Sequence, residues 1–153
     1  MEVTPLEMSE HRVRFADLME LTKPRITFLV LITTLVGFYM ASQDGIRFLL
    51  LFHTIFGTAL VAAGASAMTQ YLERHLDARM VRTRNRPLPD GRLHPNEALL
   101  FSTIISVAGV VYLMFFVNVL TGGIGALTLT AYIFVYTPLK TRTALCTLIG
   151  AFP

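Results

Sequence analysis

The chain has little of two things that most soluble proteins contain, namely cysteine and charge. Its one cysteine, Cys146, excludes an internal disulfide and leaves no cysteine spacing that would bind a metal. Charged residues make up 15% of the 153 residues, whereas soluble domains average about 25%. Residues 26–68 carry only Asp44 and Arg47 as charges, and residues 98–139 carry none. Such long, nearly uncharged runs indicate a protein that lies in lipid.

The apolar runs have the lengths that membrane-spanning helices need, about 20 residues each. The run over residues 98–139 is 42 residues long and exceeds one span. It divides at residues 118–125, where an asparagine and three glycines cluster as turn formers. The sequence therefore predicts an all-α, polytopic transmembrane helix bundle with four spans. These are expected over about residues 26–42, 48–68, 98–117 and 122–137.

A fifth apolar run begins at residue 144 and reaches the last residue of the chain. It contains ten residues, which is too short to cross a membrane. We therefore expect residues 1–153 to be the N-terminal part of a single, longer transmembrane domain.

The positive residues predict an orientation. With the N-terminus inside, twelve of the 13 lysines and arginines lie on one side of the membrane, and only Arg47 lies on the other. Positive residues favour the cytoplasmic side. Residues 1–22 are therefore expected as a cytoplasmic or interfacial segment of a protein in the inner (plasma) membrane, and residues 69–97 as a cytoplasmic loop. The arginines flank spans and lie beside acids, so the expected partner is the lipid bilayer and no nucleic acid.

One charged stretch, residues 69–93, stands between these apolar runs and is the candidate chemical centre. Glu73 and Asp77 are four residues apart and share one face of a helix, with Thr69 four residues earlier. The helix of the second span, at about 1.5 Å per residue, is long enough to carry both acids to the membrane boundary. Two carboxylates on one face suit Mg²⁺, which is often held by carboxylates together with substrate phosphates. We expect both acids to be exposed at that boundary.

Arginines surround these acids and suit phosphate oxygens, which the guanidinium group binds bidentately. Arg82 and Arg86 are four apart and would act together if the helix continued that far. Pro87 and Pro89 are expected to end the helix. The residues alone leave another interpretation open, in which this is an ordinary charged loop whose acids pair with arginines.

The charged stretch resembles the first acidic motif of the UbiA family of intramembrane prenyltransferases. The family pattern is Asn-x-x-x-Asp-x-x-x-Asp, followed closely by Arg-Thr-x-x-Arg-Pro. This chain has Thr69, Glu73 and Asp77 at the first three positions, then Arg82-Thr83 and Arg86-Pro87. The glutamate at position 73 and three further segments resemble the branch of the family that farnesylates haem. These segments are residues 21–25 (Leu-Thr-Lys-Pro-Arg), 77–83 and 136–140 (Tyr-Thr-Pro-Leu-Lys).

The resemblance implies more than the spacing shows. Family members hold Mg²⁺ on the diphosphate of an isoprenoid with a pair of acidic motifs, and the allylic carbocation then alkylates an acceptor. In this branch the donor is farnesyl diphosphate and the acceptor is a vinyl group of haem b; haem-handling or oxidase-assembly proteins are possible partners. Glu73 and Asp77 become candidate catalytic, metal-binding residues. Candidate binding residues for the diphosphate or the haem propionates are Arg82, Arg86, Lys23, Arg25 and Thr69.

Two departures from the pattern affect these expectations. Thr69 replaces the asparagine of the motif, and a hydroxyl is a shorter and weaker oxygen ligand than an amide carbonyl. A second acidic motif is absent, since the only acids after Asp77 are Asp90 and Glu97. We therefore expect the chain to hold half a site and to be inactive alone.

Two other functions remain open from the sequence. A prenyltransferase of the same family could act on a quinone or another aromatic acceptor. A non-catalytic helical membrane protein, such as an assembly factor or half of a transporter, would also fit the spans. Transporters often mark their site with polar groups at the membrane midplane. The charge here lies at the boundary, which favours the prenyltransferase.

Overall fold

The computed structural model describes residues 15–42 and 45–137. Within these ranges the chain is helical or turn-forming, with no strand. A short helical stretch over residues 15–21 precedes α2 (Pro24–Ala41), α3 (Phe48–Asp77), α4 (Pro95–Phe116) and α5 (Val119–Ala131), and α5 continues as the π-helix η1 (Tyr132–Tyr136). The expected fifth apolar run and Cys146 lie outside the described residues.

The prediction of an all-α bundle with four spans is confirmed. The helices α2, α3, α4 and the continuous helix Val119–Tyr136 are each long and apolar enough to cross a membrane. Large apolar side chains point outward along them, such as Phe28 at 66% exposure and Phe115 at 83%. No residue of α2 is buried. A surface of this kind is stable in hydrocarbon, and the chain is an integral membrane protein.

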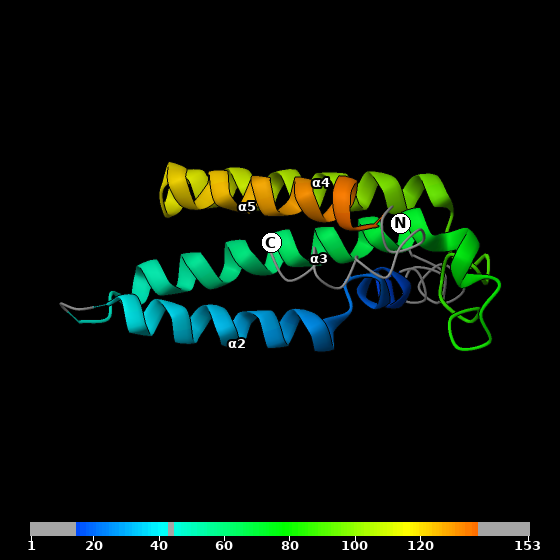
Figure 1. The fold of residues 1–153 in the computed structure, drawn as a ribbon, viewed down its shortest axis with the longest axis horizontal. Coiled ribbons are helices and arrows are strands. Elements are labelled where there is room, and N and C mark those ends of the chain that lie inside the picture. Colours follow the sequence, from blue (N-terminus) through cyan, green and yellow to red (C-terminus); the bar gives the residue numbers. More distant parts are fainter. Residues whose placement is uncertain (1–14, 43–44, 138–153) are drawn as a thin grey trace, which may run out of the picture.

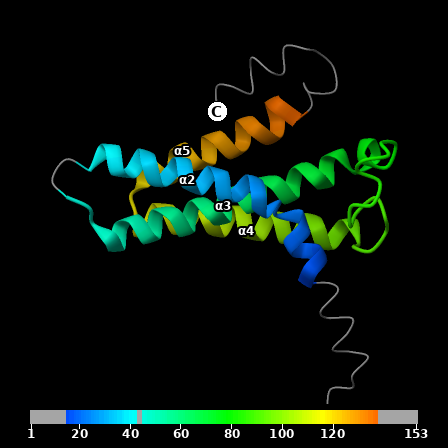
Figure 2. The same ribbon diagram turned by 90° about the horizontal axis from the view of Figure 1, so that it is seen from below.

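Helix α3 is the central element of the bundle. It lies between α2 on one side and the α4–α5 pair on the other (Figure 1). Seen from below, α3 and α4 run side by side along most of their length (Figure 2). Residues 78–94 close one end of the bundle, and the helical stretch 15–21 lies at that same end. The charged segment is thereby gathered at one end of the apolar bundle.

Glycines on α3 and α4 allow these two helices to approach closely. A β-carbon added at Gly64 would lie 2.8 Å from the backbone nitrogen of Ser106, and one added at Gly109 would lie 2.8 Å from that of Val61. Small residues at such crossings are typical of helix packing in membranes, where dispersion contacts replace the hydrophobic effect. The close crossing lies at Gly64 and Ser106 and at Gly109 and Val61, in the middle of the two helices.

The predicted turn at residues 118–125 is wrong in its position. The side chain of Asn118 accepts a hydrogen bond from the backbone N–H of Thr121, at 2.6 Å. This N-cap starts α5 at Val119, so the three glycines lie inside the helix. One of them, Gly122, is buried against Met114 of α4, where a β-carbon would lie 2.9 Å from the Met114 backbone nitrogen. Gly122 thus serves helix contact and not the turn.

A substitution at the α3–α4 crossing tests this packing. Gly109→Ala is expected to lower the free energy of unfolding in detergent by about 1–3 kcal/mol, because the added methyl overlaps the α3 backbone. Gly123→Ala is the matched control, since nothing lies within 4 Å of the added β-carbon. The control should be neutral or slightly stabilising, as alanine favours helix over glycine by up to about 1 kcal/mol. Thermal unfolding of both variants measures this, and equal midpoints would contradict the crossing.

Candidate active site

The acids of the motif lie on the last turns of α3, as the length of that helix predicts. Thr69, Glu73 and Asp77 follow one another at intervals of four residues and end the helix. Their exposures are 2%, 7% and 5%, respectively. The expectation that the two acids are exposed is therefore wrong. The chain after α3 turns back at this end of the bundle, and its buried Thr83 and its Arg86 contact Asp77.

Hydrogen bonds to Asp77, and not the prolines, end the helix. The Asp77 carbonyl accepts from the Thr83 hydroxyl at 2.9 Å and from the backbone N–H of Met80 at 3.2 Å. These bonds satisfy a carbonyl that has no partner further along the helix. The turns that follow, over residues 78–93, separate α3 from Pro87. Arg82 and Arg86 consequently do not share a helix face.

The structure brings Arg86 to the acids but leaves Arg82 outside. Arg86 Nη1 donates to Asp77 Oδ2 at 2.6 Å, and the two side chains are 27% and 6% exposed. This is a short, charge-assisted bond across the turn. Arg82 is exposed and makes no hydrogen bond or ion pair within the described part of the chain. Only one of the two candidate phosphate-binding arginines is therefore held beside the carboxylates.

Thr69 is closely packed where the family pattern has asparagine. Its hydroxyl donates to the carbonyl of Ala65, one turn earlier in α3, at 2.8 Å. The proton is thus used within the helix, and the oxygen lone pairs are what Thr69 can offer a ligand. With 2% of the residue exposed, the position leaves no evident room for a longer side chain.

Lys23 and Arg25 lie where the N-terminal stretch joins α2. Lys23 adopts a left-handed conformation, with φ of 47°, and is the N-cap of α2. The residues just before it are held to α3, because Gln70 Nε2 donates to the carbonyl of Leu21 at 3.0 Å. Gln70 follows Thr69 directly in α3. The approach to α2 is therefore attached to the same turn of α3 that begins the motif, while Arg25 remains exposed.

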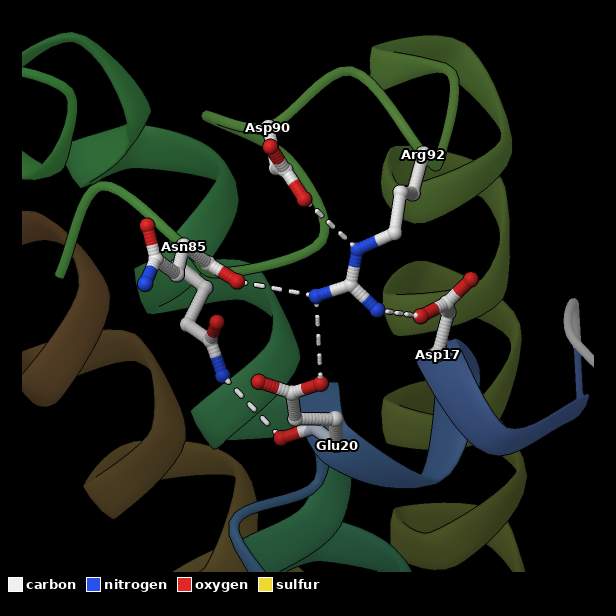
Figure 3. Close-up of polar contacts among 6 residues, drawn as sticks. Asp17, Glu20, Asn85, Asp90 and Arg92 are labelled. Atoms are coloured by element: carbon white, nitrogen blue, oxygen red, sulfur yellow. Dashed lines mark hydrogen bonds and ion pairs between the residues drawn. The ribbon is translucent and has the colours of Figure 1, made fainter.

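Sequence reasoning assigned no role to Arg92, which makes the densest set of polar contacts in the described structure. Its guanidinium bonds to Asp17, to Asp90 at 2.9 Å and to the Asn85 carbonyl at 2.8 Å, and it forms an ion pair with Glu20 at 3.5 Å (Figure 3). Burial lowers the pKa of Arg92, but the bond to Asp90 and the nearby carboxylates outweigh it and raise that pKa. No local pattern reveals this cluster, since Asp17 is 75 residues away.

The carboxylates fit a divalent cation that is shared with a phosphate ligand. No group of three or more histidine, cysteine or acidic residues that could hold a metal occurs among the described residues. Glu73 and Asp77 supply two carboxylates on one face, and the bond from Arg86 engages only Oδ2 of Asp77. Mg²⁺ commonly takes one or two carboxylates and completes its shell with water and substrate phosphates.

An apolar groove is lined in part by the same helix that carries these acids. It has a volume of about 410 Å³ and lies between α2, α3 and α5. Its α3 wall includes Thr58, Ala62 and Ser66. Thr58 lies eleven residues before Thr69, Ala62 eleven before Glu73, and Ser66 eleven before Asp77. At 3.6 residues per turn, eleven residues return to within about 20° of the same face, roughly 16 Å along the helix. The groove and the acidic motif therefore share one face of α3.

The fold and the site define a polytopic membrane protein with a buried carboxylate pair, an arginine bonded to one of the acids, and an apolar groove on the same face of the same helix. The model of the UbiA prenyltransferase family matches residues 30–153. The chain belongs to the UbiA prenyltransferase family. No solved structure matches the chain.

Curated relatives come from several bacteria and are called protoheme IX farnesyltransferases. The chain is 47% identical to the one from Solibacter usitatus, over 90% of this chain and 50% of the relative. It is 41% identical to the one from Myxococcus xanthus, over 90% of this chain and 47% of the relative. It is 40% identical to "Protoheme IX farnesyltransferase 1" of Pseudomonas putida strain W619, over 85% of this chain and 44% of the relative. The chain thus spans about half the length of the curated relatives it matches.

The Asp77–Arg86 pair can be tested by its effect on stability. Arg86→Ala leaves a buried carboxylate without its partner, so it should lower the free energy of unfolding by about 1–3 kcal/mol. Arg84→Ala removes an exposed arginine of the same turn and is the control. Thermal unfolding in detergent at neutral pH gives both values. A midpoint for Arg86→Ala equal to that of Arg84→Ala would show that the pair contributes nothing.

Proposed function

We propose that this chain forms the diphosphate-binding half of a protoheme IX farnesyltransferase, which makes haem O from farnesyl diphosphate and haem b. The observation that carries the proposal is the buried pair Glu73 and Asp77, with Arg86 bonded to Asp77, on the same face of α3 that lines an apolar groove two to three turns earlier. Membership of the prenyltransferase family and the names of the curated relatives support it. The acceptor, haem b, rests on those names and on the resemblance of residues 21–25, 77–83 and 136–140.

The arrangement suits an amphipathic donor with an apolar tail and a charged head. The groove between α2, α3 and α5 offers apolar walls for an isoprenoid chain. The carboxylates further along the same face of α3 would hold Mg²⁺, which neutralises the diphosphate when it is bound. Arg86 is positioned to donate to phosphate oxygens, and the exposed Arg82 and Arg25 and the half-buried Lys23 are further cations for the same head or for haem propionates.

The chemical step follows from this placement of charge. The allylic C–O bond of the donor breaks, and its electron pair leaves with the diphosphate. The vinyl group of haem b donates its π electrons to the resulting farnesyl cation, which forms a C–C bond and leaves a cation on the carbon next to the porphyrin. Water adds to that carbon and loses a proton, which completes a hydroxyethylfarnesyl group. Cations fixed at the diphosphate stabilise the charge that develops on the leaving group. Apolar groove walls would keep water away from the cation until it meets the acceptor.

Substitution of the acids tests the assignment of the carboxylates. In the intact protein, Glu73→Gln and Asp77→Asn should each lower kcat for farnesyl transfer by about 100-fold or more, because the charge that holds Mg²⁺ is lost. The amides keep the size of the buried acids, so the amount of folded protein should change little. Glu97→Gln, at an exposed acid in the first turn of α4, is the control. Near-normal transfer by both amide variants would disprove the assignment.

We also propose that the charged end of the bundle faces the cytoplasm of a cell whose inner (plasma) membrane holds the protein. Twelve of 13 lysines and arginines support this orientation. In a Cys146→Ser background, Gly91→Cys should react with a membrane-impermeant maleimide only in inverted vesicles. Asp44→Cys should react only in intact spheroplasts. Labelling of Gly91→Cys from the outer face would reverse the proposed topology.

A further inference from the structure

Arg92 connects three segments of the chain at the charged end of the bundle. Its guanidinium reaches Asp17 and Glu20 on the helical stretch 15–21, the carbonyl of Asn85 and the carboxylate of Asp90 (Figure 3). A guanidinium has five N–H donors in a rigid plane, so it can hold several acceptors at fixed angles. We call these five residues the Arg92 cluster.

The Arg92 cluster is the polar contact that supports the buried Asp17 carboxylate. Asp17 is 2% exposed, and its Oδ2 has no hydrogen-bond partner among the described residues. Its other oxygen accepts from Arg92. A buried carboxylate with one partner depends on that partner, because burial without a hydrogen bond is costly. The position of the stretch 15–21 is therefore tied to Arg92.

A second set of contacts joins the same stretch to the motif helix. Gln70 of α3 donates to the carbonyl of Leu21 at 3.0 Å. Leu21 is fully buried and packs in one cluster with Ala67 of α3 and with Leu88 and Leu93 of the segment after it. The stretch 15–21 is thus clamped between α3 and the segment that carries Arg86.

This clamp holds the two segments of the chain that carry the candidate cations. Lys23 and Arg25 follow the clamped stretch directly, whereas Arg82 and Arg86 lie in the turns that Arg92 holds through Asn85. We infer that Arg92 is a positioning residue, which fixes the turns that carry Arg86 relative to Glu73 and Asp77 on α3 and so sets the affinity for the diphosphate of the donor. The inference rests on the proposed function.

Positioning can be separated from folding because the fold has other supports. The segment is closed by its own backbone bonds, from Asp90 N to the Arg86 carbonyl at 3.0 Å and from Leu93 N to the Pro87 carbonyl at 3.1 Å. The spans pack through the α3–α4 crossing, which Arg92 does not touch. The Arg92 side chain is itself 37% exposed. Its loss should loosen the relation between segments and leave the bundle folded.

The experiment compares three variants of the intact protein. Arg92→Gln and the milder Asp17→Asn both break the clamp, and Arg84→Ala is the control at an exposed arginine of the same segment. We measure kcat, the KM for farnesyl diphosphate, the KM for haem b, and equilibrium binding of farnesyl diphosphate with Mg²⁺. Loss of one charge-assisted hydrogen bond should raise the KM and Kd for farnesyl diphosphate about tenfold. The KM for haem b and kcat at saturation should each change by less than about twofold. The thermal midpoint should change by no more than a few degrees.

A crosslinking experiment tests whether the loss of affinity comes from lost positioning or from the change in charge. Cysteines at positions 17 and 92, in a Cys146→Ser background, are joined by a short bis-maleimide. The linked protein should regain most of the affinity for farnesyl diphosphate that the unlinked double variant has lost. Failure to regain it would overturn the inference.

The outcomes also distinguish the inference from the proposed function. If the unmodified protein shows no Mg²⁺-dependent affinity for farnesyl diphosphate, the proposed function fails and the inference fails with it. If the unmodified protein binds but Arg92→Gln and Asp17→Asn behave like Arg84→Ala, the inference alone is overturned. A fall in kcat with an unchanged KM would overturn it as well, because positioning of a binding group acts on affinity.

Discussion

A bilayer offers no water to backbone amides, and this constraint shapes the whole molecule. Each span must satisfy its backbone hydrogen bonds internally, so the apolar runs become helices. The same constraint excludes unpaired charge from the hydrocarbon core, so six arginines lie in residues 74–92, at the end of α3 and in the turns that close one end of the bundle (Figure 1). Helix α3 connects the two environments, since its 30 residues exceed the length that the core requires. The candidate site exists because that helix continues past the membrane boundary.

The burial of Glu73 and Asp77 separates this site from an ordinary charged loop. Exposed ion pairs contribute little to stability and bind ligands weakly, because water screens them. A carboxylate that is 5% exposed and bonded to Arg86 is held in place before any ligand arrives. Carboxylates and cations that are already placed lose less entropy when they bind a charged head group. The structure shows a pairing of this kind at Asp77 and Arg86, which the residues alone allowed as a structural alternative, and under the proposed function the same pair would belong to a prepared binding site.

Packing in lipid and packing at the charged end use different means. In the spans, Gly64 and Gly109 have no side chain, so the backbones of α3 and α4 can approach each other closely. At the charged end, Leu21, Leu88 and Leu93 form a small apolar cluster, and the Arg92 cluster closes over it. The first holds the direction of α3, and the second holds the segments that carry cations toward its end. Both are required for one arrangement of charges about Asp77.

The sequence by itself determined the fold class, the four spans and the face on which Thr69, Glu73 and Asp77 lie. Hydrophobic run length and helical periodicity are local properties, so they can be read without coordinates. Only the tertiary structure decided that α5 starts at Val119 after its N-cap Asn118, that both acids are buried, that Arg86 and not Arg82 meets Asp77, and that Arg92 joins Asp17. These features depend on how turns close and on contacts between residues far apart in the chain. A run of six similar arginines contains no local signal that distinguishes one from another.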